Sequence, residues 1–237
     1  MKNFEQLLDV VESRPMRKIA VAVAHCPMVL QGTRDALDRN IATSVLLGSE
    51  AKIRKIAEEH SIDLHGLEIV NEPDPIVAAR RAVAMTSSGE AEILMKGNLH
   101  TDDFLRALLD RETGLRAGVV MSHVFVVELA QQDKFLFVTD SAMNIAPDLE
   151  KKAEILLNAV HMANVLGVTD PRVAVLAAVE LVNPKMQATV DATCLSKMSD
   201  RGQFAPHCIV DGPFALDNAI SELPAKHKNI TGPVAGK

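Results

Sequence analysis

A lysine and a glycine stand together at one turn of the sequence, and these residue types can bind an anion. The turn consists of Lys96, Gly97 and Asn98; it follows the apolar residues 93–95 and precedes a predicted helix. Thr101 is the expected N-cap of that helix. The free N–H groups and the positive dipole end of a helix start attract anions, and Lys96 adds a full charge. The same residues also suit an ordinary turn with a solvated lysine, because their spacing matches no Walker or Rossmann loop.

Polar and glycine-bearing turns also follow the other apolar stretches that have the length of strands. In an open α/β sheet the ligand crevice lies outside the carboxyl ends of the strands, so these turns are expected at one edge. The turns are residues 25–27, 71–73, 96–98 and 139–140, Glu180, and residues 211–213. Any one of these turns is more often an ordinary loop that binds no ligand, whereas their repetition favours a ligand-binding edge of the sheet.

Several side chains on this predicted edge have two interpretations. Asp140 and Asp211 can bind a substrate or form turns and caps, and for each alone the turn role is the better interpretation. Ser122 lies in an apolar stretch and can bond either an anion or a neighbouring backbone group. Asn183 and Lys185 stand at a helix start, where they form a second anion site or an ordinary N-cap.

The composition is that of a soluble, mildly acidic globular protein. Apolar residues make up 48% of the 237 residues, and the formal net charge is −6. No apolar run approaches the ~20 residues of a membrane span, and no signal-peptide pattern opens the chain, so a cytoplasmic protein without a membrane partner is expected. Acidity and the absence of Trp and Tyr argue against nucleic-acid binding. The widely spaced Cys26, Cys194 and Cys208 fit neither a disulfide framework nor a zinc site.

The order of the elements predicts an α/β protein with mostly parallel, doubly wound sheets. Apolar stretches of strand length alternate with helical patterns, which is typical of βαβ units. The predicted strands are residues 18–24, 42–48, 67–70 and 93–95, and the predicted helices are residues 3–11, 33–40, 49–60, 75–89 and the helix after Thr101. These elements belong to a first domain, residues 1–146.

The stretches 118–129 and 134–139 are predicted to form an antiparallel pair, joined by a turn at Gln131, Gln132 and Asp133. A second α/β domain is predicted from residue 147 to residue 237. Its expected helices are residues 148–166, 185–198 and 215–223, its expected strands are residues 171–179 and 207–210, and residues 211–213 are expected to form a turn. The remaining tail is expected either to be disordered or to belong to a longer chain.

Several motifs, in order along the whole chain, resemble the phosphate acetyl/butyryltransferase family, and its butyryl branch in particular. They are HCPMVLQGTRDAL near the start, MKGNLHT (95–101), VTDSAMNIAPDLEKKAEIL (138–156), NPKMQATVDA (183–192), DGPFALDNAIS (211–221) and the final GPVAGK. The resemblance implies two α/β domains with a cleft between them, an isocitrate/isopropylmalate dehydrogenase-like architecture, and a homo-oligomer. It also implies the reversible reaction acyl-CoA + phosphate ⇌ acyl phosphate + CoA.

In this family the CoA thiolate is expected to attack the acyl phosphate directly in a ternary complex. CoA is then a substrate, and no bound cofactor or metal is required. The resemblance assigns Lys96, Gly97, Thr101 and Ser122 to the phosphate side. The residues expected to line the cleft or hold its loops are Asp140, Asn144, Asn183, Lys185, Asp211 and Gly212.

Members of the family continue beyond a GPVAGK-like segment to a Ser-Arg-Asp-type motif associated with phosphate binding and the base. That motif matches no position here, so no catalytic residue is assigned, and a C-terminal segment is expected to be lacking. The alternative function is a non-catalytic fragment that binds CoA and acyl phosphate. A dehydrogenase related by fold alone is a third possibility, but no GxGxxG motif follows a strand.

Overall fold

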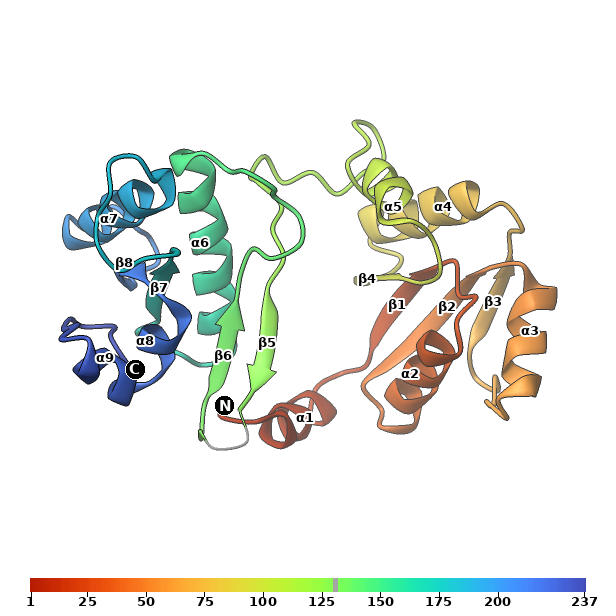
Figure 1. The fold of residues 1–237 in the computed structure, drawn as a ribbon. Helices are drawn as coiled ribbons and strands as arrows, with labels where there is room; N and C mark the ends of the chain where they lie inside the picture. Colours follow the sequence, from red (N-terminus) through yellow and green to blue (C-terminus); the bar gives the residue numbers. More distant parts are fainter. Residues whose placement is uncertain (130–131) are drawn as a thin grey trace. The chain divides into compact units, whose positions relative to one another are not determined.

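The chain is divided into two compact units in the computed structural model, which describes residues 1–129 and 132–237 (Figure 1). One unit is Leu8–Gly118, and the other combines Met1–Leu7 with Val119–Lys237. This division differs from the boundary predicted between residues 146 and 147. Residues 119–146 belong with the C-terminal part because their two strands form a sheet of their own, separate from the four-stranded sheet of the first unit.

The unit Leu8–Gly118 contains a four-stranded parallel sheet with the strand order β3-β2-β1-β4. Its strands are β1 (Arg17–Ala22), β2 (Ala42–Gly48), β3 (Glu68–Asn71) and β4 (Ile93–Lys96). Its helices are α2 (Pro27–Asp38), α3 (Glu50–Glu59), α4 (Pro75–Ser87) and α5 (Thr101–Leu108), while α1 (Phe4–Glu12) begins in the other unit. The predicted strands and their parallel order are confirmed.

Helices cover both faces of this sheet, which explains its nearly continuous apolar sequence. Ala20 and Val45 face α4 and α5, whereas Val21 and Leu46 face α2 and α3 (Figure 1). All four side chains are fully buried. Burial of a Val or Leu side chain stabilises a fold by about 1.5–3 kcal/mol relative to exposure.

Local sequence signals place most helix starts of this unit. Ser49 caps α3 through its hydroxyl, and Asp74 caps α4 through Oδ1, which accepts from the N–H of Ile76 at 2.8 Å. The prediction that Thr101 caps α5 is wrong by one residue, because His100 has the extended backbone of an N-cap and Thr101 is already helical. Helix α2 begins at Pro27, six residues earlier than predicted, since proline suits the first helical position.

The other unit contains an antiparallel pair and a parallel pair of strands. The antiparallel strands are β5 (Phe125–Glu128) and β6 (Phe135–Val138); the parallel strands are β7 (Arg172–Leu176) and β8 (Ile209–Phe214). The helices are α6 (Leu149–Val165), α7 (Gln187–Asp200), α8 (Leu216–Ile220) and α9 (Glu222–His227). The antiparallel pair is confirmed, although the part of its predicted turn at Gln131 lies outside the described residues.

Two predictions for this unit are wrong. The strand expected over residues 118–129 is only β5, because residues 120–123 bond to side chains of α6 and the loop after β6 instead of a neighbouring strand. Residues 211–213 do not form a turn but lie inside β8, where the register with β7 shifts between Ala174 and Leu176. Of the two alternatives expected for the tail, disorder is not observed, because Val234 is 3% exposed and packs against Phe214 of β8.

The first residues of the chain pack against this C-terminal unit. The Met1 amine donates to the carbonyl of Leu166 at 3.2 Å, and the N–H of Phe4 donates to Oε2 of Glu128 at 2.8 Å. The ring centroids of Phe4 and Phe135 are 5.1 Å apart. Residues far apart in the sequence therefore contact one another within this unit.

Among residues 1–129 and 132–237, no helix is long and apolar enough to cross a membrane.

Candidate functional site

The turn after β4 crosses the end of β1 at very short range. The N–H of Gly97 donates to the carbonyl of Ala22, and the N–H of Asn98 to that of Val23, each at 2.8 Å. A Cβ on Gly97 would lie 2.1 Å from the carbonyl oxygen of Val23, so only glycine fits without movement. Gly97 is therefore required for the path of the backbone, independently of any ligand.

Lys96 and Thr101 lie on either side of this turn. Lys96 is the last residue of β4, pairs with Ala22 of β1 and has an exposed side chain. Thr101 is the exposed first residue of α5, and the acidic Asp102 follows it in the same turn of helix. Lys96 is thus accessible to an anion, whereas the carboxylates of α5 oppose one, and the predicted phosphate role of this turn remains a prediction.

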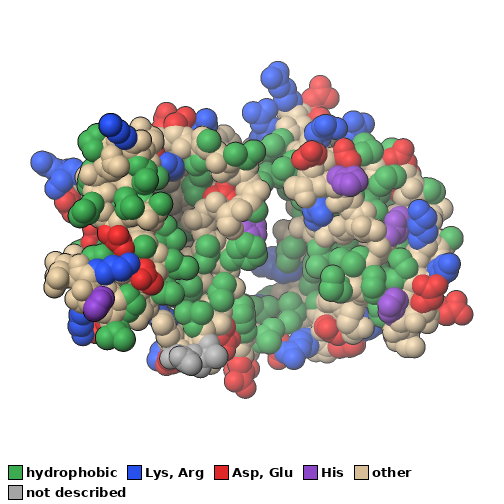
Figure 2. Space-filling view, in the orientation of Figure 1, with side chains coloured by type: hydrophobic (Ala, Val, Ile, Leu, Met, Phe, Trp, Pro, Cys, Tyr) green, Lys and Arg blue, Asp and Glu red, His purple; other side chains and the backbone are tan. Residues whose placement is uncertain are grey.

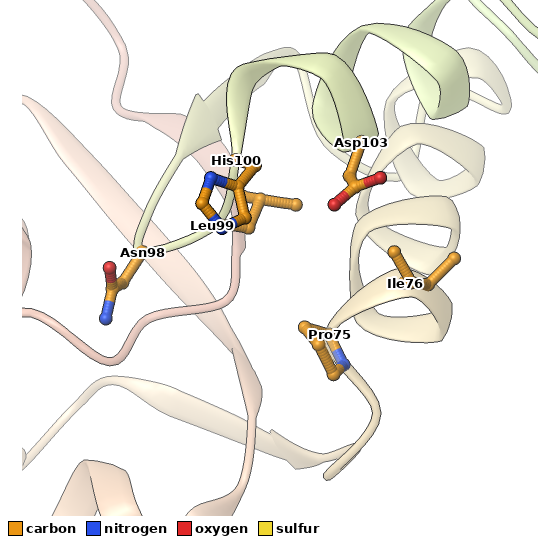
Figure 3. A pocket seen from close by; sticks show the side chains of 6 residues that line it. All are labelled: Pro75, Ile76, Asn98, Leu99, His100 and Asp103. Atoms are coloured by element: carbon orange, nitrogen blue, oxygen red, sulfur yellow. The ribbon is translucent and has the colours of Figure 1, made fainter.

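A pocket of about 270 Å³ lies beside the turn, between the starts of α4 and α5 (Figure 3). It is lined by Pro75, Ile76, Asn98, Leu99, His100 and Asp103. Sequence reasoning did not assign Pro75, Ile76, His100 or Asp103 to a site. The available signal was that both helices start directly after strands of a parallel sheet, at the edge where ligands bind.

His25 is fixed at the same edge, just after β1. Its Nε2 accepts a hydrogen bond from the N–H of Ser49 at 2.8 Å, and a Cβ on Gly48 would lie 2.6 Å from this nitrogen. Burial, helped by the charge of Lys52, lowers the pKa of His25. His25 is therefore held neutral with its proton on Nδ1, and it links the end of β2 to β1.

In the C-terminal unit, Asp140 and Asn144 organise the loop between β6 and α6. Oδ1 of Asp140 accepts from the N–H of Met143 at 3.1 Å, and Oδ2 accepts from the N–H of Asn144 at 3.1 Å and from its side-chain amide. Desolvation raises the pKa of Asp140, but the hydrogen bonds from Asn144 and from backbone amides outweigh it and lower the pKa. The loop interpretation of Asp140 thus has direct geometric support.

The structure brings Ser122 close to this loop. Asn144 donates to the carbonyl of Met121 at 2.9 Å, and the N–H of His123 donates to Oδ1 of Asp140 at 3.4 Å. The hydroxyl of Ser122 accepts from Nδ2 of Asn158, on α6, at 2.9 Å. Of the predicted site residues, Ser122, Asp140 and Asn144 therefore form one connected group.

Asn183 and Lys185 lie on the loop that leads into α7. The carboxamide of Asn183 accepts from the N–H of Lys185 at 3.0 Å, and the N–H of Asn183 donates to the hydroxyl of Thr189 at 2.9 Å. Thr189 is fully buried, while Asn183 and Lys185 are exposed. The buried threonine thus fixes the loop and leaves the lysine accessible.

Asp211 lies in β8, and Gly212 follows it. Oδ1 of Asp211 accepts from the N–H of Gly212 at 2.8 Å, and a Cβ on Gly232 would lie 2.3 Å from Oδ2. Burial raises the pKa of the Asp211 carboxyl, and the charge of Asp200 adds to this effect. A Cβ on Gly212 would lie 2.7 Å from the carbonyl of Val175. Gly232 therefore lets the tail approach the carboxylate closely, and Gly212 lets the backbones of β7 and β8 approach each other.

Charges of both signs lie side by side on the drawn face of the protein (Figure 2). Within the described part of the chain, no group of three or more His, Cys, Asp and Glu residues is arranged to hold a metal ion. The groups that this geometry offers to a ligand are exposed lysine side chains, backbone amides and ordered polar loops.

Solved structures resemble this fold closely. A branched-chain phosphotransacylase from Enterococcus faecalis V583 matches with a TM-score of 0.78 and 31% identity, over 93% of this chain and 76% of that one. A phosphotransacetylase from Staphylococcus aureus, 19% identical, shares the fold with a TM-score of 0.70, over 98% of this chain and 80% of that one.

Sequence relatives agree with the structural ones. A phosphate butyryltransferase of Clostridium acetobutylicum is 48% identical over 237 residues, which are 100% of this chain and 78% of the relative. A phosphate acetyltransferase of Thermotoga maritima is 42% identical over 233 residues, or 98% of this chain and 78% of the relative. The family model described as phosphate acetyl/butaryl transferase matches residues 3–78 and 74–237. The chain therefore belongs to the phosphate acetyl/butyryl transferase family.

Proposed function

We propose that this protein is a phosphate acyltransferase that transfers an acyl group reversibly between CoA and inorganic phosphate. The observation that carries the proposal is the 48% identity to a phosphate butyryltransferase along the full length of the chain. The substrates are acyl-CoA, CoA, phosphate and acyl phosphate. CoA acts as a substrate, and the protein is expected to work as a homo-oligomer.

The reaction proceeds by direct attack in a ternary complex. The CoA thiol loses its proton to a base, and the thiolate attacks the carbonyl carbon of the acyl phosphate. A C–S bond forms, the C–O bond to phosphate breaks, and phosphate leaves with the electron pair. Cations and backbone N–H groups stabilise the charge on the leaving group.

The site residues predicted from the sequence are assigned two roles in this reaction. Lys96, Gly97, Thr101 and Ser122 serve the phosphate side, and the exposed side chain of Lys96 supports this assignment. The other assigned residues, Asp140, Asn144, Asn183, Lys185, Asp211 and Gly212, hold loops around the substrates. A dehydrogenase-like arrangement of two domains with a cleft is part of the same proposal.

The test is phosphate-dependent release of free CoA thiol from butyryl-CoA and acetyl-CoA by the purified chain. Release should require phosphate, and omission of phosphate is the control. Binding of CoA without any release would favour the alternative, a CoA-binding protein without the chemistry.

Lys96→Ala tests the phosphate assignment separately. Loss of a charged contact to phosphate should raise the KM for phosphate about tenfold, as expected for a charge-assisted hydrogen bond. The KM for acyl-CoA should change little. An unchanged KM for phosphate would remove Lys96 from the phosphate site.

A further inference from the structure

The pocket beside the β4–α5 turn has room for one end of a substrate. Its volume is about 270 Å³, whereas pockets that enclose a whole drug-sized ligand have about 300–1,000 Å³. We propose that this pocket binds the adenine ring of CoA. The inference rests on the proposed function, because CoA is the substrate that brings an adenine.

The lining combines apolar walls with hydrogen-bonding groups. Pro75, Ile76 and Leu99 are apolar, and in Figure 3 the carboxylate of Asp103 points toward the space between Leu99 and Ile76. The remaining lining residues, Asn98 and His100, are exposed polar side chains. Such a lining suits a flat ring that has both donors and acceptors on its edge.

The polar groups match the edge of adenine. The amino group of adenine donates a hydrogen bond and its N7 accepts one, and the side-chain amide of an asparagine can pair with both groups. Oδ1 of Asp103 lies 3.3 Å from Nη1 of Arg106, which leaves Oδ2 to accept from the amino group. His100 offers an imidazole for stacking or for a hydrogen bond to a ring nitrogen.

The other parts of CoA fit this lining less well. Among the described residues, no lysine or arginine lines the pocket, and the Asp103 carboxylate repels the phosphate groups. An acyl chain would cover the Asp103 carboxylate, which is 29% exposed, and would offer it no hydrogen bond. The pantetheine arm has amides, but it is flexible and loses more conformational entropy on binding than a rigid ring does.

Binding to the full chain tests the proposal, with CoA, adenosine and pantetheine as separate probes in isothermal titration calorimetry. Asp103→Ala should weaken CoA and adenosine binding about tenfold, as expected for one lost hydrogen bond to a charged group, and leave pantetheine unchanged. Asp102→Ala is the matched control, because Asp102 lies in the same first turn of α5 but does not line the pocket. Ile76→Trp should fill the space and weaken CoA and adenosine at least as much.

Two outcomes would overturn the adenine assignment. One is CoA binding that Asp103→Ala leaves within twofold of the original chain. The other is an equal loss of pantetheine and CoA binding, which would assign the pocket to the pantetheine arm or to general structure.

Assays of thiol release with two substrates distinguish a failure of the adenine site from a failure of the proposed function. Asp103→Ala should raise the KM for butyryl-CoA without lowering kcat, and leave the KM for S-butyrylpantetheine unchanged, because that substrate has no adenine. If Asp103→Ala releases thiol from butyryl-CoA with an unchanged KM, the adenine site is rejected and the proposed function is unaffected. Adenosine binding that depends on Asp103, without release from either substrate, would contradict the proposed function and support the site.

Discussion

Gly97 illustrates how a single residue fixes the path of the chain at the sheet edge. A Cβ at this position would meet the backbone of Val23 at 2.1 Å, and a backbone atom cannot rotate away as a side chain can. Gly97→Ala should therefore lower the free energy of unfolding by about 1–3 kcal/mol, the usual cost of overpacking. Urea denaturation measures this change.

Gly32 provides the matched control for that substitution. It lies within α2, and a Cβ there would meet no atom of the described residues within 4 Å apart from its own helix backbone. Gly32→Ala should stabilise the protein by about 0.5–1 kcal/mol, because alanine is the better helix former. Equal effects of the two substitutions would contradict the close approach of the backbone at Gly97.

His25 should make stability depend on pH. Its pKa is lowered in the folded protein, so below the ordinary value of about 6.5 the unfolded chain binds more protons than the folded one. The stabilisation by neutral His25 is fully present above that value and is lost as the pH falls through the lowered folded pKa. His25→Gln should reduce the slope of unfolding free energy against pH just below 6.5.

Urea midpoints measured between about pH 7.5 and pH 5.5 test this expectation. The lowered carboxyl pKa of Asp140 acts only at more acidic pH, so it does not contribute in this window. His60→Gln is the control, since His60 is exposed at the end of α3. The same slope in the original chain and in His25→Gln would contradict the role of His25.

At the scale of elements, one carboxylate ties the loop before α7 to the helices at the end of the chain. Oε1 of Glu180 accepts from Nδ2 of the fully buried Asn218 at 2.5 Å and from Nζ of Lys228 at 2.8 Å. The hydrogen bond from Lys228 lowers the pKa of Glu180, so the carboxylate stays ionised. The loop that carries Lys185 is thus held by Glu180 at one end and by Thr189 at the other.

Glu180→Ala should loosen this loop. The buried amide of Asn218 would lose its acceptor, and an unpaired buried polar group costs about 1–3 kcal/mol. Hydrogen exchange of residues 181–186 should become roughly tenfold faster or more. Glu222→Ala is the control, because Glu222 pairs with Lys226 on the exposed surface of α9. Equal exchange in the two variants would contradict the anchoring.

At the scale of the whole molecule, the two units have separate hydrophobic cores, so we expect them to unfold in separate transitions. Ile53 is fully buried in the core of the unit Leu8–Gly118, and Leu195 is 2% exposed in the core of the other unit. Each substitution by alanine should cost about 2–5 kcal/mol and lower the melting temperature of its own unit. Calorimetry should resolve two transitions, each sensitive to one variant. A single transition that both variants shift equally would contradict this independence.

The sequence was sufficient for the parallel sheet of the first unit. Its strands are nearly continuous apolar runs of strand length, and their helices carry caps such as Ser49 and Asp74. The sequence was insufficient where tertiary contacts decide. Polar side chains such as Asn158 form hydrogen bonds with the backbone of residues that were predicted to be a strand. Asp211 pairs with β7 although its local sequence is typical of a turn.

The division of the chain at Gly118 and the pocket beside the β4–α5 turn were not predicted from the sequence, for a related reason. No change of composition marks Gly118, because the boundary depends on which strands pair with each other. Pro75 and His100 line one pocket although they come from two different helix starts, and only the three-dimensional fold brings them together. Among the predicted site residues, Ser122 and the motif positions Asp140 and Asn144 do come together in one group.

The packing of Met1–Leu7 against the C-terminal unit has a consequence for the order of events on the ribosome. Residues 1–7 are made well before the residues that they contact, since Met1 contacts Leu166 and Phe4 contacts Phe135. Domains generally fold as units during synthesis, so Leu8–Gly118 can fold while the first segment still waits for its partners. A bulky fusion partner attached at Met1 would compete with this late docking step and slow the maturation of the C-terminal unit.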